Sequence, residues 1–211
     1  MLLDRPLEGI LGQYSKVKIL RFLVKSQAQL NGREIAKNVG LSHVKAHTAL
    51  KDLTKHGVVN MRSVGSSLIY WLNEEHFLVK EIIRPAFEKE EALLKYVAGI
   101  ILKEILPPRP LSIILFGSFA KGNALANSDI DVVIVYPHQK NKSLLAKELS
   151  EAEKRITLLF GNHLASVPFS IHEFQNKLKK KSAFINEIIR TGKVIYGKSI
   201  SELINLNGKK D

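Results

Sequence analysis

The stretch from Leu111 to Tyr136 constrains the fold most, because it places two carboxylates beside a turn between two buried strands. Its two apolar runs are short, rich in Ile and Val and bounded by turn formers, which is the pattern of buried strands. The first run ends at Gly117-Ser118, and the second carries Asp129 and Asp131. Side chains two residues apart on a strand point to the same face, so both carboxylates are expected to project together.

Two neighbouring carboxylates repel each other unless a cation lies between them. At about 7 Å and an effective dielectric constant near 20, the repulsion is roughly 2 kcal/mol. Ligation by oxygen alone favours Mg²⁺ or Mn²⁺ over Zn²⁺, and Mg²⁺ commonly shares itself with substrate phosphates. The Gly117-Ser118 turn suits those phosphates, because glycine admits a ligand to the backbone and the Ser118 hydroxyl and helix-opening N–H groups bind anions. The stretch therefore predicts a site for an NTP with Mg²⁺ or Mn²⁺.

These motifs resemble the signature of the polymerase β-like nucleotidyltransferase superfamily, especially its minimal nucleotidyltransferases. The matching segments are Gly117-Ser118, Ala120-Lys121-Gly122 and Ser128-Asp129-Ile130-Asp131. The resemblance extends over residues 107–197 and implies a mixed sheet with flanking helices. It also implies catalytic and metal-binding roles for Asp129 and Asp131, and nucleotide-binding roles for Gly117, Ser118 and Lys121. An active member would transfer NMP from an NTP to an acceptor hydroxyl.

The sequence departs from the active pattern at one point. Active relatives carry a third carboxylate on a later strand, whereas the strand expected from His163 to Phe169 contains no acid, and the nearest following acid is Glu173. Loss of a general base costs about 100-fold to 10,000-fold in rate. Two alternatives therefore stay open: a degenerate domain that acts as nucleotide sensor or scaffold in a DNA-binding transcriptional regulator, and an antitoxin-like module that modifies a partner protein.

The N-terminal residues predict a winged helix-turn-helix, with three helices followed by a β-wing. We expect a helix from about Ser15, capped by that residue, a short helix ending near Gly40, and a helix from His43 to about His56 capped by Ser42. Strands before and after a turn at residues 65–67 would form the wing.

The stretch LSHVKAHTALKDLTKHGVV is similar to the recognition helix and wing entry of winged-helix regulators. A recognition helix places its outer face in the major groove of DNA. By that resemblance the candidate DNA contacts are Ser42, His43, Val44, Lys45, His47, Thr48 and Lys51 on the helix, with Arg62 and Ser66 in the wing.

Charge favours DNA as the partner of this module over a protein. Net charge is +12 in total, with +7 over residues 1–72, −2 over residues 73–106 and +7 over residues 107–211. These ranges are the three expected domains: winged helix, helical connector and nucleotidyltransferase. If about six phosphates are contacted, the logarithm of the DNA affinity should fall with the logarithm of salt concentration with a slope near −5.

The connector carries an apolar stripe at helical spacing. We expect either a helix break at Arg84 or a new helix with Pro85 in its first turn. The stripe is expected to pack on its own chain, and a winged-helix homodimer is the alternative. A later helix, residues 141–159, should bury one apolar side. The stripe residues are Phe87, Leu94, Val97, Ile101 and Ile105, and the residues of the later helix are Leu144, Leu145, Leu149 and Ile156.

The sequence also predicts a soluble, cytoplasmic protein. It has no cysteine, which excludes disulfides and thiolate metal sites. Its first residues lack an apolar core of signal-peptide length, and no apolar run reaches the roughly 18 residues of a membrane span. We therefore expect no membrane partner.

Overall fold

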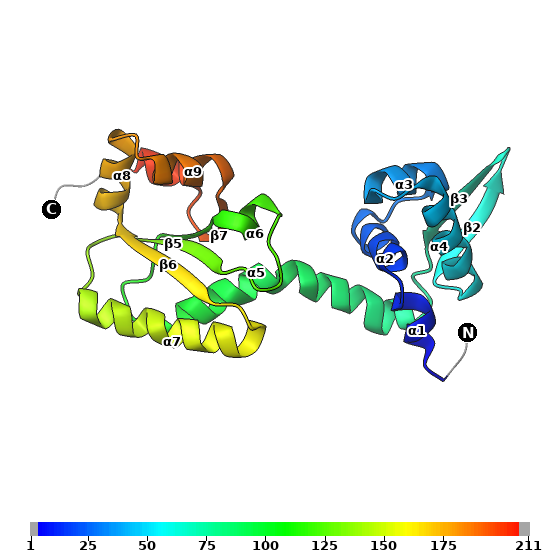
Figure 1. The fold of residues 1–211 in the computed structure, drawn as a ribbon, viewed down its shortest axis with the longest axis horizontal. Coiled ribbons are helices and arrows are strands. Elements are labelled where there is room, and N and C mark those ends of the chain that lie inside the picture. The colour runs from blue at the N-terminus through cyan, green and yellow to red at the C-terminus, as the bar shows by residue number, and fades with distance from the viewer. Residues whose placement is uncertain (1–3, 207–211) are drawn as a thin grey trace. The chain divides into compact units, whose positions relative to one another are not determined.

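A computed structural model of the chain describes residues 4–206, which separate into two compact units, residues 4–91 and residues 92–206 (Figure 1). The boundary between the units lies within residues 73–106, so that segment contributes to both units. None of the helices formed by residues 4–206 combines the length and apolar character that a membrane crossing requires.

The N-terminal unit has the predicted winged-helix layout. Helices pack beside a three-stranded antiparallel sheet of order β1-β3-β2, whose β2–β3 hairpin is the wing. Buried leucines of α2 and α4, among them Leu20, Leu23, Leu50 and Leu53, form its core. The elements are α1 (Pro6–Leu11), α2 (Tyr14–Ser26), β1 (Leu30–Asn31), α3 (Gly32–Val39), α4 (His43–Lys55), β2 (Val59–Val64) and β3 (Ser67–Leu72).

The helix ends agree with the sequence in two of three cases. α3 stops before Gly40, whose left-handed backbone forms its C-cap, and the Ser42 hydroxyl accepts from the Lys45 N–H at α4. The sequence analysis did not select Asn31 and Glu34, which form a reciprocal capping box at the start of α3. The prediction for Ser15 is wrong, because α2 begins one residue earlier, at Tyr14. Its N-cap is Gln13, whose side chain makes no capping hydrogen bond.

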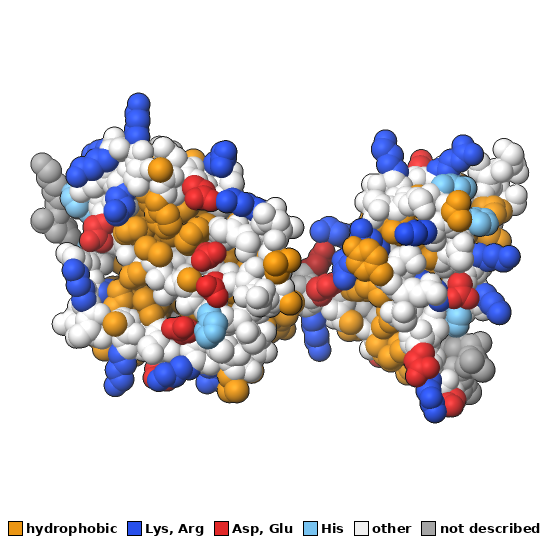
Figure 2. All heavy atoms as spheres, in the orientation of Figure 1, with side chains coloured by type: hydrophobic (Ala, Val, Ile, Leu, Met, Phe, Trp, Pro, Cys, Tyr) orange, Lys and Arg blue, Asp and Glu red, His pale blue; other side chains and the backbone are white. Residues whose placement is uncertain are grey.

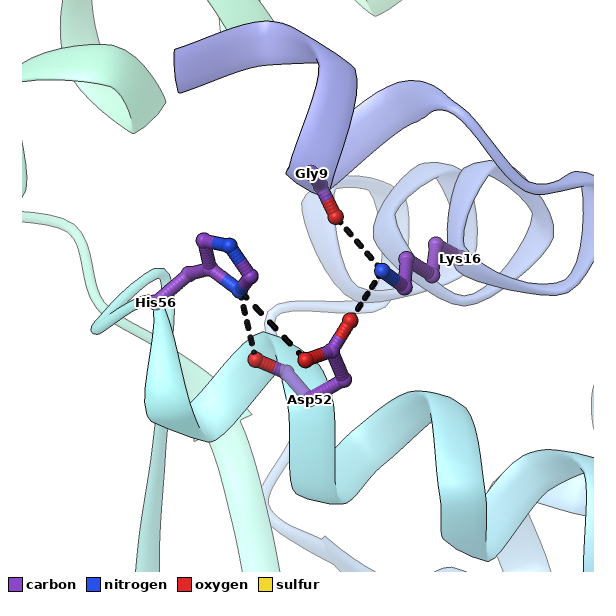
Figure 3. Close-up of polar contacts among 4 residues, drawn as sticks. All are labelled: Gly9, Lys16, Asp52 and His56. Atoms are coloured by element: carbon purple, nitrogen blue, oxygen red, sulfur yellow. Dashed lines mark hydrogen bonds and ion pairs between the residues drawn. The ribbon is translucent and has the colours of Figure 1, made fainter. Parts of the chain in front are cut away.

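A buried lysine joins three helices of this unit (Figure 3). The Lys16 ammonium, on a residue only 4% exposed, donates to the Gly9 carbonyl of α1 and to the Asp52 carboxylate of α4. His56 Nδ1 donates to the Asp52 carbonyl oxygen over 2.8 Å. The hydrogen bond from Lys16 is the main cause that lowers the pKa of Asp52. The network fixes α1 and α2 against the helix expected to read DNA.

Replacing Lys16 by Met should destabilise the N-terminal unit by about 1–3 kcal/mol at neutral pH, because the partly buried Gly9 carbonyl and Asp52 carboxylate lose their shared donor. The lowered pKa of Asp52 gives a stabilising contribution that is present above the unfolded-state pKa and is lost as the pH falls through the folded-state pKa. Urea unfolding should therefore show the difference between wild type and variant shrinking in acid. An equal difference in unfolding free energy at neutral and at acid pH would contradict this role. Lys25→Met, at an exposed lysine, is the control.

The connector forms a π-helix, η1 (Val79–Ile83), that continues into α5 (Arg84–Glu104). Pro85 lies in the first turn of α5, which confirms the second of the two alternatives for this residue. The predicted stripe packs on its own chain: Phe87 packs against the core of the N-terminal unit, whereas Val97 and Ile101 are buried in that of the C-terminal unit.

The C-terminal unit is built on a mixed sheet, as predicted, and its four strands have the order β6-β5-β4-β7. β5 runs parallel to β6 and antiparallel to β4, which is antiparallel to β7. The elements are β4 (Ser112–Leu115), α6 (Gly117–Lys121), β5 (Ile130–Tyr136), α7 (Lys142–Phe160), β6 (Leu164–Ser170), α8 (Ile171–Lys179), α9 (Ala183–Thr191), β7 (Lys193–Gly197) and α10 (Ile200–Asn205).

Helices cover both faces of this sheet (Figure 1). On one face Val133 and Val135 of β5 share a core with Ile185 and Ile188 of α9. On the other face the alternate residues of β5 pack with α5 and α7. Asp131 has the same parity as Val133, so its side chain belongs to the face that α8 and α9 cover.

Two details of this unit differ from the sequence prediction. Leu144, expected on the buried side of α7, is 44% exposed, because it lies in the first turn of the helix and burial begins at Leu145. The sequence analysis also missed α10, a six-residue helix capped by Ser199 and Glu202.

Candidate functional site

The site in the C-terminal unit begins where the backbone after β4 touches a carboxylate of β5. The Phe116 N–H donates to the Asp131 carbonyl oxygen over 2.9 Å. Gly117 follows with a φ of +68°, and a Cβ atom placed on it would lie 2.1 Å from Asp131 Oδ2. Glycine is therefore required at position 117 both by the left-handed backbone and by the carboxylate packed against it.

The two aspartates differ in their surroundings. Asp131 is half-buried on β5, whereas Asp129 is exposed and lies one residue before the strand begins. Burial raises the pKa of Asp131, and the nearby charges of Asp129 and Glu187 raise it further. The charge of Asp129 thus acts on Asp131, although Asp129 lies just outside the strand on which the sequence analysis placed both residues. A cation would relieve the repulsion between them.

β6, the strand on which the resemblance led us to expect a third carboxylate, contains no acid. In the parallel register of β5 and β6, Asp131 is paired with Ala165. Glu173 does not replace it, because Glu173 caps α8 through Ser170, beyond the opposite end of β6. Within residues 4–206, no three His, Cys, Asp or Glu side chains are grouped so that they could hold a metal ion.

Sequence reasoning missed Glu187, the second acid, after Asp129, whose charge acts on Asp131. Glu187 lies on α9, and its carboxylate pairs with the Lys121 ammonium at the end of α6 over 2.5 Å. The partners are 66 positions apart and meet because β7, which follows α9, pairs with β4, which precedes α6. No local pattern around Glu187 signals this contact.

The donor set fits a divalent metal that keeps part of its hydration. Asp129 and Asp131 offer carboxylate oxygens, which suit Mg²⁺ or Mn²⁺. Two protein ligands leave coordination positions for water and phosphate, which is the usual way proteins bind Mg²⁺. Ser118 and Lys121 lie on α6 directly after the Gly117 turn, where phosphate oxygens would meet a hydroxyl and an ammonium group.

The predicted DNA-contact residues all lie on the exposed surface of the N-terminal unit. Ala46, Ala49, Leu50 and Leu53 form the buried side of α4, which confirms the predicted division of that helix into two sides. Two of the candidates are partly engaged within the unit. The Thr48 hydroxyl donates to the Val44 carbonyl oxygen, and the Arg62 guanidinium donates to Gln29 and lies over the Trp71 ring.

A hollow of about 410 Å³ lies between the start of α3, the outer side of α4 and the wing. His43 and His47, whose rings stack with their centroids 6.2 Å apart, line it together with Ser66. Arg33 of α3 lines it too. The sequence analysis did not select Arg33, because its place in the first turn of another helix hides its proximity to α4.

Comparisons with known proteins bear on both units. Residues 100–190 match the family model described as "Nucleotidyltransferase domain", which confirms the resemblance of the C-terminal unit. No curated protein matches the chain.

Three solved structures show partial similarity. The first is a homodimeric winged helix-turn-helix DNA-binding domain from Mycobacterium bovis, with 21% identity, 43% of this chain and 76% of that chain covered, and a TM-score of 0.33. The second is a toxin–antitoxin structure with AMP-PNP, with 19% identity, coverages of 52% and 79%, and a TM-score of 0.37. The third is a tri-AMPylated Shewanella oneidensis HEPN toxin in complex with MNT antitoxin, with 16% identity, coverages of 54% and 80%, and a TM-score of 0.34.

Proposed function

We propose that the C-terminal unit binds an NTP with Mg²⁺ and transfers NMP to an acceptor hydroxyl, and that the N-terminal unit binds DNA. The observation that carries the first part is the contact between Gly117 and Asp131. The left-handed backbone and the carboxylate packed against it exclude every residue with a Cβ atom at this turn. The backbone is therefore open to a ligand directly beside Asp131, where phosphate and metal would have to meet.

Each residue of the site would have a separate task. Asp129 and Asp131 would hold the metal, and the Ser118 hydroxyl and the Gly117-Ser118 backbone would bind β- and γ-phosphate oxygens. Lys121 would neutralise phosphate charge. A divalent metal, when bound, offsets the charge that develops as pyrophosphate leaves in line with the attacking hydroxyl.

Acceptor activation is the weakest part of the site. Ala165 stands opposite Asp131 and β6 carries no acid, so the general base that the resemblance implies on this strand is missing. Positioning and the metal would then supply most of the acceleration, with a rate about 100-fold to 10,000-fold below that of a site with a base. This feature supports the second candidate, a nucleotide sensor or scaffold in a DNA-binding regulator. A protein acceptor, as in antitoxin-like modules, remains within the first candidate.

The test of the first candidate is calorimetric titration of ATP, CTP, GTP and UTP into the protein, with and without Mg²⁺. Magnesium-dependent binding of at least one NTP is expected. Transfer of labelled NMP to a hydroxyl acceptor would then separate enzyme from sensor. If no NTP binds with Mg²⁺, the site holds no substrate and the proposal fails.

For the N-terminal unit, the double variant Thr48→Ala with Lys51→Ala should weaken binding to duplex DNA. Lys51 is exposed on the outer side of α4, and loss of one phosphate contact reduces the salt slope by about 1. Fluorescence anisotropy at several salt concentrations measures both effects.

Lys25→Ala is the charge-matched control for that variant, because Lys25 lies at the end of α2 in an exposed pair with Glu91. It should leave the slope nearly unchanged. Equal weakening by the control and by the α4 variant would show that general charge, and not the outer side of α4, governs DNA binding.

A further inference from the structure

Lys121, which the proposed function assigns to phosphate, forms an ion pair with Glu187. Lys121 follows Gly117 by four residues, so the two lie on the same side of α6. Its ammonium is 2.5 Å from Glu187 Oε1. The phosphate-binding turn and the ion pair therefore share one side of this short helix, and the free site holds its lysine in a competing contact.

The pair is open to solvent and therefore exchangeable. The side chains of Lys121 and Glu187 are 39% and 37% exposed. Ion pairs of this kind contribute little to stability, because water screens both charges. A triphosphate offers Lys121 several charged oxygens, and ammonium–phosphate hydrogen bonds belong to the strong class. A bound triphosphate can thus displace the Glu187 carboxylate.

Glu187 also lies near the metal-binding end of the site. Among residues 4–206, Asp129 and Glu187 are the charged groups that raise the pKa of Asp131. α9 packs on α6, and Thr191 donates its hydroxyl to the Glu187 carbonyl oxygen over 2.9 Å, which ties the residue into the last turns of α9. The carboxylate is thus presented from a rigid helix.

We propose that Glu187 is a positioning residue that competes with triphosphate oxygens for the Lys121 ammonium and thereby sets the affinity of the site. The inference rests on the proposed function of the C-terminal unit. It assigns Glu187 a role through Lys121 and none as a metal ligand, which agrees with the lack of any grouping of three metal-binding side chains among residues 4–206.

The test is a double-mutant cycle of Glu187→Gln and Lys121→Met, with inorganic tripolyphosphate as the probe in EDTA. Because this probe has no base and the solution no metal, the titration reports the phosphate contacts alone. Removal of the competing carboxylate should tighten tripolyphosphate binding roughly fivefold. In the Lys121→Met background, Glu187→Gln should change the affinity for tripolyphosphate by less than about twofold, because the ammonium group for which Glu187 competes is gone.

Glu151→Gln is the matched control, because Glu151 forms an exposed ion pair with Lys154 over 2.8 Å on α7 of the same unit. It should leave the affinity unchanged. Thermal unfolding of every variant shows whether the ion pair only holds α6 against α9. If its role is purely structural, Glu187→Gln should lower the melting temperature and leave the affinity for tripolyphosphate unchanged or weaker.

The outcomes separate this inference from the proposed function. Tripolyphosphate or Mg²⁺–NTP binding in wild type with unchanged or weaker affinity in Glu187→Gln overturns the role of Glu187 alone. An equal gain in both lysine backgrounds also overturns it, because repulsion without competition would produce that result. If Glu187→Gln binds NTP more weakly than wild type only when Mg²⁺ is present, Glu187 is a metal ligand instead. Absence of binding in every variant and condition overturns both proposals.

Discussion

Replacing Asp129 and Asp131 together by Asn is expected to abolish magnesium-dependent NTP binding and to reduce NMP transfer at least about 100-fold. Asparagine keeps the shape of each side chain but removes the negative charge that would hold a divalent cation. Calorimetry with and without Mg²⁺ and a labelled-nucleotide transfer assay measure the two losses. Retention of magnesium-dependent binding would remove both residues from the metal site.

Asp131→Asn alone provides the control for folding. Burial raises the pKa of Asp131, so its charged form is less favourable in the folded state. In wild type, stability is therefore lost as the pH rises from the unfolded-state pKa to the folded-state pKa, and it stays lower above that interval. Asparagine removes this effect, so at neutral pH the single variant should melt no earlier than wild type. A lower melting temperature for Asp131→Asn would mean that the double variant loses NTP binding through misfolding.

The spacing of residues predicted the most local parts of the molecule. Gly117 and Asp131 were selected because a turn and a strand carboxylate occur at a fixed distance in sequence, and the two meet in the structure. The outer side of α4 was predicted because its apolar residues repeat at helical spacing. In both cases the chemistry depends on neighbours along the chain.

Contacts between distant segments could not be predicted in this way. Glu187 reaches Lys121 only because β7 joins β4 and brings α9 beside α6. Arg33 approaches His43 only through the packing of α3 on α4. Leu144 fits the apolar period but precedes the part of α7 that the sheet covers. Charge, by contrast, can be read from composition alone, and Figure 2 shows Lys and Arg side chains on the visible surface of both units.

Gly117→Ala should have the second large effect, on stability and on nucleotide binding together. The left-handed backbone at Gly117 alone costs a residue with a Cβ atom about 1–2 kcal/mol. In addition the new methyl group would lie 2.1 Å from Asp131 Oδ2, so α6 or the carboxylate must move. Either movement displaces metal and phosphate ligands from each other, and NTP affinity should fall at least about tenfold. Thermal unfolding and calorimetry measure the two effects.

Gly122→Ala separates backbone strain from the contact with Asp131. Gly122 ends the same helix with a similar φ of +76°, but a Cβ atom there would have no neighbour within 4 Å. Both variants should therefore lose similar stability from backbone strain, and only Gly117→Ala should lose NTP binding. If Gly122→Ala weakens binding equally, the strain of α6 as a whole controls the site. If neither variant affects binding, the close approach of Gly117 to Asp131 has no part in holding the nucleotide.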